Sequence, residues 1–465
     1  MIIENTSATR LDEILAAQKQ YFRTGATLDA AFRKQQLKTL LGTLEAHEQA
    51  LADALWQDLH KSYEEAYLTE ISLVKAEIRA AMRHVGRWAR RERKCTPVTI
   101  FGSKSYIVKE PLGAALIVSP WNYPVQLLLN PLVGAIAAGC TAVLKPSPYV
   151  PNVSMAIERM IRSAFQDEYI AVAQGNREVN RHLFAQKFDL IFFTGSPALA
   201  RTVAAAAAEN LTPLVLELGG KSPCIIGRDA DIKLAAKRIA WGKTLNAGQT
   251  CIAPDYLLVH PDVKEAFIAA FGEAVRHLHG DDIRQQKHYV RMVNDKAFER
   301  VSGYIAEGTV RYGGGTDAAE RFIEPTLLDG LAPDADVLTT EIFGPVFPIV
   351  TLDDPSRSFE DQVVDYVVSR EKPLALYYFG RESEGWAIVR RTSSGGCCIN
   401  DTIMHIVNPN VPFGGVGNSG MGHYHGRESF EAFTHRRAVI ATPTWFDLPF
   451  RYMPYKLFKL VKKMV

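Results

Sequence analysis

The chain has 465 residues, of which 47% are hydrophobic and 22% are charged, and this balance excludes an intrinsically disordered chain. Its length predicts two or three domains of about 150 residues each. The 53 basic and 51 acidic side chains give a formal net charge of +2. The protein as a whole therefore has no strong positive field that would attract nucleic acid, and no nucleic acid partner is expected.

The first part of the chain favours helices. Residues 28–59 and 64–93 are rich in Ala, Leu, Glu, Lys and Arg at helical spacing. Beyond Pro97 the pattern changes, because residues 99–113 alternate apolar and polar side chains around Gly102. Alternation of this kind around a glycine predicts a β-hairpin.

Residues 111–144 contain no charged side chain, which raises the question of a membrane span. Four prolines divide the run, and its longest proline-free piece has 13 residues, fewer than the ~20 that a span needs. Short, turn-punctuated apolar pieces are typical of the centre of an α/β sheet. We therefore expect buried parallel strands at residues 115–118 and 141–144, with a helix at residues 125–138 between them.

Strand and helix patterns alternate along the rest of the chain and predict two α/β units with doubly wound parallel sheets. The first unit continues with strands at residues 170–173, 189–193 and 213–218 and with helices after Pro151, Asn176 and Ser196. In the second unit we expect strands at residues 223–227, 255–260, 321–328, 347–352, 373–379 and 395–400. Its helices are expected at residues 231–243, 261–277, 358–369 and 382–392. The units join near Gly219 and Gly220, directly after a strand, where ligands of such sheets gather.

Three side chains are candidates for catalysis, and each has a structural alternative. Cys251 lies in a polar loop near Gly248, where a nucleophilic thiolate would be accessible, although a lone cysteine is more often an inert small hydrophobe. Glu217 ends an apolar strand, where desolvation would raise its pKa toward that of a general base; the alternative is an ion pair with Lys221. Asn122 lies between two prolines, where its amide could stabilise an oxyanion or form an Asx turn.

Two further features suit an anionic cofactor. Lys145 follows a strand at the edge where ligands of α/β sheets bind, although a solvated charge is equally consistent with that position. Residues 193–196 combine a strand end, a glycine turn and a helix start. The free N–H groups and the dipole of such a helix start favour a pyrophosphate.

Two other patterns are interpreted as structural. Gly415, Gly417 and Gly420 fit a G-x-G-x-x-G spacing, but no clear strand precedes them, so we expect a loop. His423 and His425 have no matching ligand cluster nearby, so we expect structural or surface histidines and no metal site.

Seven segments stand in one order along nearly the whole chain: PWNYP (120–124), LKPS (144–147), FTGS (193–196), LELGGKSP (216–223), GQTCIAPDY (248–256), EIFGPV (341–346) and PFGGVGNSGMGHYHG (412–426). Together they resemble the NAD(P)-dependent aldehyde dehydrogenase superfamily. The resemblance is greatest to its class 3 branch, the fatty and aromatic aldehyde dehydrogenases.

The resemblance implies two doubly wound parallel-sheet domains and a small β arm for oligomerisation. The implied NAD(P)-binding domain comprises residues 1–97 and 111–217, the catalytic domain residues 218–428, and the arm residues 98–110 and 429–442. Class 3 relatives are commonly dimers, so a homodimer is expected. Many relatives have a glutamate at the position of Pro148, where it can repel a 2′-phosphate, so NAD and NADP both stay open as cofactors. Many also have a glycine at the position of Ala200.

The resemblance also implies roles for individual residues. Cys251 matches the nucleophile, Asn122 and the backbone N–H of Cys251 match the oxyanion hole, and Glu217 matches the general base. The positions that match cofactor-binding residues are Trp121, Lys145, Gly195, Ser196, Leu218, Gly219, Glu341 and Phe343. The implied reaction oxidises an aliphatic medium- or long-chain aldehyde, or an aromatic one, to its carboxylic acid. It proceeds through a thiohemiacetal and a thioester on Cys251, with water as the final acyl acceptor.

Two other functions stay open at this point. A CoA-acylating relative would transfer the acyl group to CoA instead of water, which the glutamate at position 217 disfavours. A non-catalytic structural or binding protein on the same fold is disfavoured because Cys251, Asn122 and Glu217 are all retained.

The C-terminal tail, residues 443–465, is basic and amphipathic. Residues 451–465 carry five basic side chains and no acidic one. In a helix, one face would be apolar and another basic, formed by Leu457, Leu460, Val461 and Met464 and by Lys456, Lys459 and Lys463. Such a helix would allow weak peripheral contact with an anionic membrane. A solvated tail, or one packed on its own subunit, is favoured over that contact.

The cysteines indicate the compartment. There are six, and none forms a C-x-x-C pair, which is too sparse for a disulfide scaffold. The N-terminal residues have no signal-peptide pattern. We therefore expect reduced thiols in a cytoplasmic protein.

Overall fold

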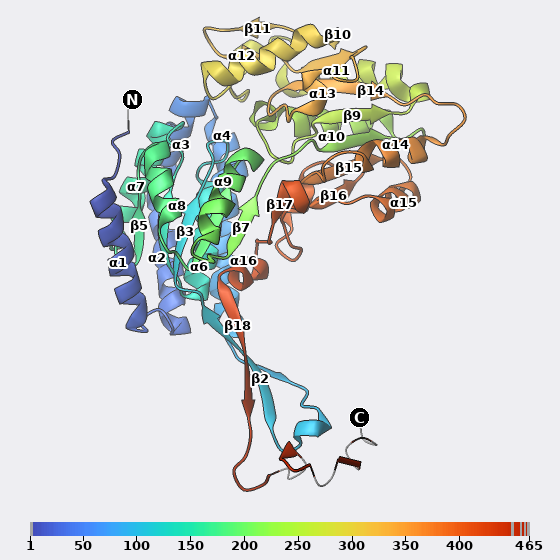
Figure 1. Ribbon diagram of the computed structural model, residues 1–465. Coiled ribbons are helices and arrows are strands. Elements are labelled where there is room, and N and C mark those ends of the chain that lie inside the picture. Colours follow the sequence, from blue (N-terminus) through green and yellow to red (C-terminus); the bar gives the residue numbers. More distant parts are fainter. Residues whose placement is uncertain (1–2, 448–450, 456–457, 460–461, 463–465) are drawn as a thin grey trace.

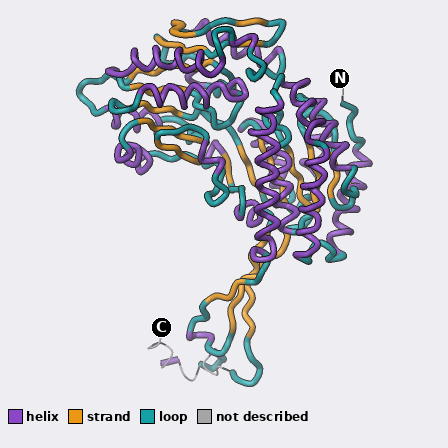
Figure 2. The backbone as a smooth tube through the Cα atoms, turned by 180° about the vertical axis from the view of Figure 1, so that it is seen from behind, coloured by secondary structure: helices purple, strands orange, loops and turns teal. Residues whose placement is uncertain are grey.

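The structure, a computed structural model, describes residues 3–447, 451–455, 458–459 and 462. The described residues form two α/β units and a narrow arm that projects from them (Figure 1). The arm points away from both units in the view from behind as well (Figure 2). The α/β class and the two parallel sheets predicted from the sequence are confirmed.

The first sheet has six strands, in the order β17 (Gly420–Met421), β7 (Leu214–Glu217), β6 (Leu190–Thr194), β3 (Ala114–Val118), β4 (Thr141–Lys145) and β5 (Ile170–Val172). Neighbouring strands are parallel except β17 and β7. β3 and β4 are buried along their whole length, and so is the helix that connects them. This burial on all sides explains the uncharged run at residues 111–144.

Helices cover both faces of the first sheet. One face packs against α1 (Ala8–Arg23), α8 (Arg177–Ala185) and α9 (Pro197–Ala208). The apolar cluster on the other face includes α2 (Ala30–Ala46), α3 (Glu48–Leu59), α5 (Ser72–Trp88), α6 (Gln126–Ala138) and α7 (Pro151–Arg162). A short α4 (Tyr63–Ala66) and one π-helical turn (Tyr67–Ile71) lead into α5.

The second sheet has seven strands, in the order β10 (Thr309–Tyr312), β13 (Thr326–Asp329), β14 (Val346–Thr351), β9 (Tyr256–Val259), β8 (Pro223–Ile226), β15 (Ala375–Phe379) and β16 (Gly396–Ile399). Of these seven, β10 alone is antiparallel to its neighbour. One face packs against α10 (Ile232–Thr244) and α11 (Lys264–His279), the other against α14 (Phe359–Val368) and α15 (Glu382–Arg391). α12 (Asp295–Gly303) and α13 (Asp336–Thr339) pack against β13 and β14.

The arm is a third, antiparallel sheet in the order β1 (Glu92–Lys94), β2 (Lys104–Pro111) and β18 (Thr434–Ala441), which follows α16 (Arg427–Ala432). The predicted hairpin is present, and Gly102 lies in its loop with φ +87°. Its first strand is not where the sequence places it, because Val98–Ile100 form a 3-10 turn and β1 pairs with β2 instead. Pro97 immediately before this turn has no N–H for a strand ladder.

Two segments of the second unit also differ from the expectation. The sequence predicts one strand at residues 321–328, but Pro325 divides it into β12 (Phe322–Ile323) and β13, and β12 pairs with β11 (Thr316–Asp317). The glycine-rich segment expected as a loop contributes β17 to the first sheet. The remaining short 3-10 turns of the described chain are Leu245–Gly248, Pro261–Val263, Ile283–Gln285, Tyr304–Glu307, Met404–Val407 and Gly417–Ser419.

In the described parts of the chain, no helix is both long and apolar enough to cross a membrane. The predicted apolar face of the tail, Leu457, Leu460, Val461 and Met464, lies outside the described residues, and so do Lys456 and Lys463.

Candidate active site

A cavity of about 2040 Å³ lies where the carboxyl ends of β3, β4, β6 and β7 face the second unit. Every residue that the sequence suggests for catalysis or cofactor binding lines this cavity. These residues are Trp121, Asn122, Lys145, Gly195, Ser196, Glu217, Leu218, Gly219, Cys251, Glu341 and Phe343. The fold therefore brings together side chains that lie far apart in the sequence.

The loop that carries Cys251 follows α10 and has a left-handed backbone. Asn246, Ala247 and Gly248 have φ values of +52°, +51° and +72°. A side chain at Gly248 would collide with the backbone carbonyl of Gly344. Only glycine therefore fits at this position, and the path of the chain into Cys251 depends on it.

Buried hydrogen bonds of Gln249 hold this loop in place. Gln249 Nε2 donates to the carbonyl oxygens of Asn246 and Arg291, each at 3.1 Å. Its Oε1 accepts from the backbone N–H of Val293 at 3.0 Å. Because Gln249 is fully buried, these bonds are shielded from water, and Cys251 is presented from a fixed loop.

Asn122 bonds to the Cys251 loop and not to its own backbone, so the Asx turn considered from the sequence is not what the structure contains. Its Nδ2 donates to the carbonyl oxygen of Gln249 at 3.0 Å, and Asn246 Nδ2 donates to the carbonyl oxygen of Asn122, also at 3.0 Å. An amide nitrogen carries two N–H groups, so Asn122 keeps one for a ligand in the cavity that it lines.

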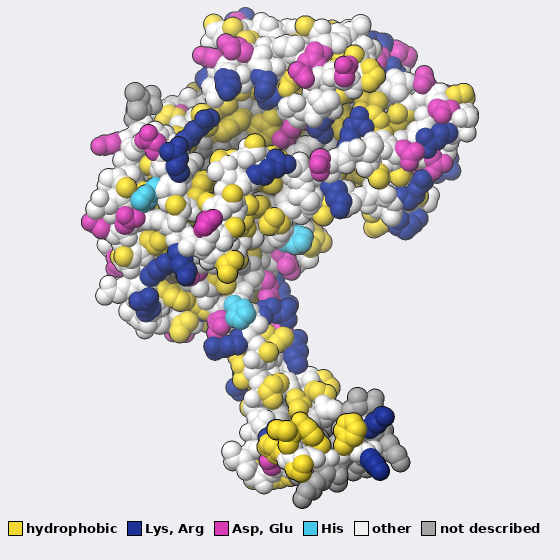
Figure 3. Space-filling model, in the orientation of Figure 1, with side chains coloured by type: hydrophobic (Ala, Val, Ile, Leu, Met, Phe, Trp, Pro, Cys, Tyr) yellow, Lys and Arg dark blue, Asp and Glu magenta, His cyan; other side chains and the backbone are white. Residues whose placement is uncertain are grey.

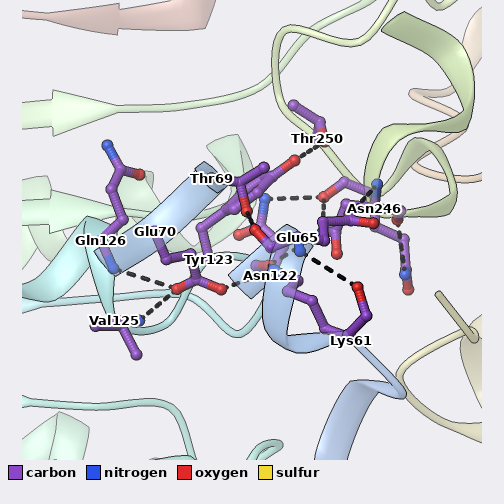
Figure 4. Close-up of polar contacts among 12 residues, drawn as sticks. Lys61, Glu65, Thr69, Glu70, Asn122, Tyr123, Val125, Gln126, Asn246 and Thr250 are labelled. Carbon is purple, nitrogen blue, oxygen red and sulfur yellow. Dashed lines mark hydrogen bonds and ion pairs between the residues drawn. The ribbon is translucent and has the colours of Figure 1, made fainter. Parts of the chain in front are cut away.

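A buried ion pair beneath Asn122 was not predicted. Lys61 and Glu70 are both fully buried and lie 2.7 Å apart, and Lys61 Nζ also donates to the carbonyl oxygen of Asn122 at 3.1 Å. Glu70 accepts from the backbone N–H groups of Val125 and Gln126 at 2.8 and 3.2 Å (Figure 4). The pair thus fixes the backbone at Asn122 through Lys61, and at Val125 and Gln126 through Glu70. Breaking a buried pair from one side costs about 3–5 kcal/mol.

Two further contacts join α4 and the Asn122 segment to the Cys251 loop. Glu65 Oε1 accepts from the backbone N–H of Asn246 at 2.9 Å, and the hydroxyls of Tyr123 and Thr250 lie 2.6 Å apart (Figure 4). Burial raises the pKa of Glu65 to about 7, although the charge of Lys61 acts in the opposite direction. The Asn122 segment and the Cys251 loop are therefore fastened to one support.

Among the described residues, Glu217 has no counter-charge beside it. It is 3% exposed, and neither of its carboxylate oxygens has a hydrogen-bond partner among the described residues. Lys221, the alternative partner, instead pairs with Asp255 and donates to the carbonyl oxygens of Val337 and Thr340 at 2.8 and 2.9 Å. Burial alone raises the pKa of Glu217 well above its ordinary range. A carboxyl in this condition can take up a proton readily.

The Cys251 thiol is also held in its neutral form. Burial, together with the carboxyls of Glu341 and Glu217, raises the pKa of Cys251 to about 12. The backbone N–H groups of Cys251 and Ile252 act in the opposite direction. A thiol with this pKa needs a nearby base, or a positive charge entering the cavity, to become a nucleophile.

Lys145 has unused hydrogen-bonding capacity in the cavity. It is 1% exposed, and its Nζ donates to the carbonyl oxygen of Pro146 at 2.8 Å. Burial lowers the pKa of this ammonium to about 8. Because an ammonium has three N–H groups, two are left for a ligand in the cavity that Lys145 lines.

The turn at residues 193–196 differs from the expectation in one respect. The N–H of Gly195 donates to the carbonyl oxygen of Glu217 at 3.0 Å and is not free for an anion. Ser196 is the N-cap of α9, and its Oγ accepts from the N–H of Leu199 at 3.4 Å. What faces the cavity is therefore the capped first turn of a 12-residue helix, with its dipole.

The part of the cavity lining formed by Gly219, Glu341 and Phe343 leaves little free space beside Gly219. A side chain at Gly219 would collide with the carboxyl of Glu341, and burial raises the pKa of that carboxyl to about 8. The rings of Trp121 and Phe343 meet edge to face, with their centroids 5.3 Å apart. A buried ammonium, a helix N-terminus, a glycine cradle and an aromatic pair along one cavity fit an extended dinucleotide.

The histidine pair and the glycine-rich segment were both interpreted from the sequence as structural. His425 is buried, its backbone N–H donates to Ser429 Oγ at 2.9 Å, and burial lowers the pKa of its imidazole to about 4. His423 is exposed. Gly415 packs against the backbone of Ser419. Within the described ranges, no three His, Cys, Asp or Glu side chains gather as metal ligands would.

Comparison with known proteins gives consistent results. The profile described as the aldehyde dehydrogenase family matches residues 2–439. The chain is 44% identical over 448 residues to 4,4′-diaponeurosporen-aldehyde dehydrogenase of Staphylococcus aureus, an alignment that covers 96% of each protein. It is 40% identical over 450 residues to the dog (Canis lupus familiaris) enzyme named aldehyde dehydrogenase, dimeric NADP-preferring, covering 96% of this chain and 98% of that one.

A solved structure, the substrate-bound state of Staphylococcus aureus AldH, superposes with a TM-score of 0.95 at 42% identity and covers 98% of this chain and 99% of the other. The match spans both sheets and the arm, so the likeness extends to the whole architecture. The chain belongs to the aldehyde dehydrogenase family and is an NAD(P)-dependent enzyme that oxidises aldehydes.

Proposed function

We propose that this enzyme oxidises its aldehyde through a covalent thioester on Cys251 and that water releases the carboxylic acid. One observation carries the proposal: Cys251, Asn122 and an unpaired Glu217 share one cavity. The three groups supply a nucleophile, an oxyanion donor and a proton acceptor, which are the parts that acyl transfer requires.

The residues act in a defined sequence. Glu217 takes the thiol proton, and Cys251 Sγ forms a bond to the aldehyde carbon. The second N–H of Asn122 and the backbone N–H of Cys251 donate to the resulting oxyanion. NAD(P) bound along the cavity, where Lys145 and Glu341 would hold it, would supply the hydride acceptor. Loss of hydride from this carbon leaves the acyl group joined to Cys251 as a thioester. Glu217 releases the thiol proton to solvent and then takes a proton from water, whose oxygen attacks the thioester carbon. The bond between this carbon and Cys251 Sγ breaks, the acid leaves, and Glu217 returns its proton to the thiolate.

Water is favoured over CoA as acyl acceptor because of Glu217. A buried carboxyl with no partner can deprotonate water at the thioester, whereas transfer to a thiol does not need that base. CoA added to the assay should therefore leave the yield of free acid unchanged. Formation of acyl-CoA at the expense of the acid would instead establish the acylating reaction.

The substrate class follows from the side chains around Cys251. Trp121, Leu127 and Phe343 line the same cavity and present aromatic and aliphatic surface to a substrate. We propose aliphatic aldehydes of medium or long chain, or aromatic aldehydes. In a panel of aldehydes, kcat/KM should rise with chain length from acetaldehyde upward, since each buried CH₂ contributes about 0.8 kcal/mol. A preference for acetaldehyde would contradict this assignment.

The direct test of the catalytic role is the Cys251→Ala variant. It should form no NAD(P)H from any aldehyde while binding the cofactor as the wild-type enzyme does. The exposed Cys95 provides a matched control, because Cys95→Ala removes a thiol outside the cavity and should retain full activity. Undiminished turnover in Cys251→Ala would refute the assignment.

We also propose that the protein is a homodimer formed through its arm. Hydrophobic side chains gather at the far end of the arm (Figure 3). In the segment before β2 and the segment after β18, Val98, Phe101 and Trp445 are 65%, 64% and 82% exposed. A second copy would remove these groups from water. Light scattering should then find a dimer, and Phe101→Asp should shift it toward monomer. The same experiment on a chain without residues 451–465, which keeps Trp445, separates the arm from the tail. Loss of low-salt liposome binding in that truncated chain would assign the tail to a membrane.

The compartment proposed is the cytoplasm. All six cysteines are free thiols, and Cys397 and Cys398 stay unlinked although they are neighbours in sequence. Free thiols in this number are typical of a reducing compartment.

A further inference from the structure

This inference rests on the proposed function, in which the nicotinamide end of the cofactor reaches Cys251. The order of the strands in the first sheet then indicates where the adenosine end lies. Glu217 ends β7, and β4 and β5 lie three and four strands away in the sheet order. At about 4.8 Å per strand these separations are about 14 and 19 Å. Lys145 ends β4, and α8 follows β5. A dinucleotide whose nicotinamide reaches Cys251 therefore has its adenosine ribose near Lys145 and α8.

Two arginines of α8 line this end of the cavity without partners. Arg177 and Arg181 both border the cavity, and they lie four residues apart, on one face of the helix. Neither guanidinium has a hydrogen bond or an ion pair to any residue that the structure describes. Both side chains are exposed, and like charges one helical turn apart repel each other, so an anion bound between them would relieve this repulsion.

The surroundings strengthen the positive character of this end. Among the cavity residues of the segments 145–149 and 176–184, the charged side chains are Lys145, Arg177, Arg181 and Glu178. This gives an excess of two positive charges over the one acid. The position after Ser147 is a proline, which adds no carboxylate to oppose a second anion.

We propose that Arg177 and Arg181 bind the 2′-phosphate of NADP and make this enzyme prefer NADP to NAD. A 2′-phosphate brings about 1.5–2 negative charges at neutral pH, which matches the excess of two positive ones. A guanidinium binds phosphate oxygens through two parallel N–H groups, a geometry that the ribose hydroxyl of NAD does not satisfy. The preference thus lies in the electrostatics of α8 and not in the catalytic residues.

Adenosine fragments test this site without requiring turnover. The dissociation constants of adenosine 2′,5′-bisphosphate and of 5′-AMP are measured by calorimetry on the wild-type enzyme, Arg177→Ala, Arg181→Ala and the double variant. Arg159→Ala is the control, because Arg159 is exposed on α7, which covers the other face of the sheet, and does not line the cavity. Unchanged affinity for 5′-AMP verifies that each variant is folded at this end of the cavity.

The wild-type enzyme should bind the bisphosphate at least about tenfold more tightly than 5′-AMP, as charge-assisted contacts to phosphate imply. Each single variant should lose part of this preference, the double variant all of it, and Arg159→Ala none. In kinetics, the KM for NADP should rise in the double variant while the KM for NAD and kcat stay unchanged. Arg177→Lys with Arg181→Lys, which keeps both charges, should restore part of the preference.

Two results would overturn the proposal: equal affinity of the wild-type enzyme for the two fragments, or a loss in the double variant no larger than in the control. Activity with NAD in either case would leave the proposed reaction standing. An enzyme that binds the bisphosphate as described but oxidises no aldehyde with either cofactor would instead contradict the proposed reaction and leave the phosphate site standing.

Discussion

The Asn122→Ala variant should lose most of its turnover and keep most of its stability. In the proposed mechanism, Asn122 supplies one of two donors to the oxyanion, and the backbone N–H of Cys251 supplies the other. Removing one donor of this kind costs about 2.7–4 kcal/mol of transition-state stabilisation, which is about 10²–10³ in kcat.

The cost to folding is smaller for a reason visible in the hydrogen bonds. Asn122 Nδ2 donates to the carbonyl oxygen of Gln249, but that oxygen also accepts from Asn246 Nδ2 at 3.0 Å and keeps a partner when Asn122 is shortened. The backbone carbonyl of Asn122 keeps its bond to Lys61 in the variant. Loss of one hydrogen bond of this kind costs about 1 kcal/mol of unfolding free energy.

The assay compares kcat and KM of Asn122→Ala with those of Tyr123→Phe, and urea denaturation gives the stability of both. Tyr123→Phe removes the 2.6 Å contact with Thr250 from the same segment without touching the oxyanion donor. Its kcat should stay within about tenfold of wild type, since it loses an ordinary hydrogen bond. A kcat for Asn122→Ala no lower than that of Tyr123→Phe would refute the role given to Asn122.

Two further predictions concern stability. Gly248→Ala should lower the free energy of unfolding by about 2–5 kcal/mol, because it adds left-handed backbone strain and a collision with Gly344. Gly330→Ala, at φ +64° and without a close contact, should lower it by only about 1–2 kcal/mol. Urea denaturation measures both losses, and equal losses would contradict this. Burial lowers the pKa of His405 and of His425 from 6.5 to about 4, so the unfolded chain binds protons that the folded one does not. Stability should therefore fall as pH drops from 6.5 toward 4, and phenylalanine at either position should flatten that part of a denaturation profile; an unchanged slope would be inconsistent with the buried neutral imidazoles.

The elements that the sequence predicts well are those whose local pattern and burial agree. β3, β4 and α6 fall where the uncharged run places them, because every one of their residues is buried. β17 was missed because a two-residue strand has no periodicity of its own and exists only through pairing with β7. The arm was placed only in part, because β1 is a short charged strand with no apolar alternation.

Glu217 and Lys145 were predictable because strand ends of parallel sheets meet at one edge. Trp121, Glu341 and Phe343 were indicated only by the resemblance to the family. The residues that hold these side chains in place were not predictable. Lys61 lies between α3 and α4, and Glu70 lies in the π-helical turn that follows α4. Charged side chains in such a charge-rich stretch are ordinarily exposed, and no local pattern indicates that both are fully buried beneath Asn122. The partner of Lys221 was equally undetermined, since Asp255 reaches it only through the second sheet.

The thioester on Cys251 is the central claim, and mass spectrometry of the Glu217→Gln variant tests it most directly. Mixed with aldehyde and cofactor, this variant should form one NAD(P)H per site, more slowly than the wild-type enzyme because the thiol must ionise without Glu217, with the positive charge of the oxidised nicotinamide favouring the thiolate instead. It should then stall, because it also lacks the base that activates water. Its mass should increase by that of the aldehyde less two hydrogens, on the peptide that contains Cys251, and Cys251→Ala should show no adduct. Release of free acid by Glu217→Gln at the wild-type rate, or an adduct on any other residue, would contradict the account.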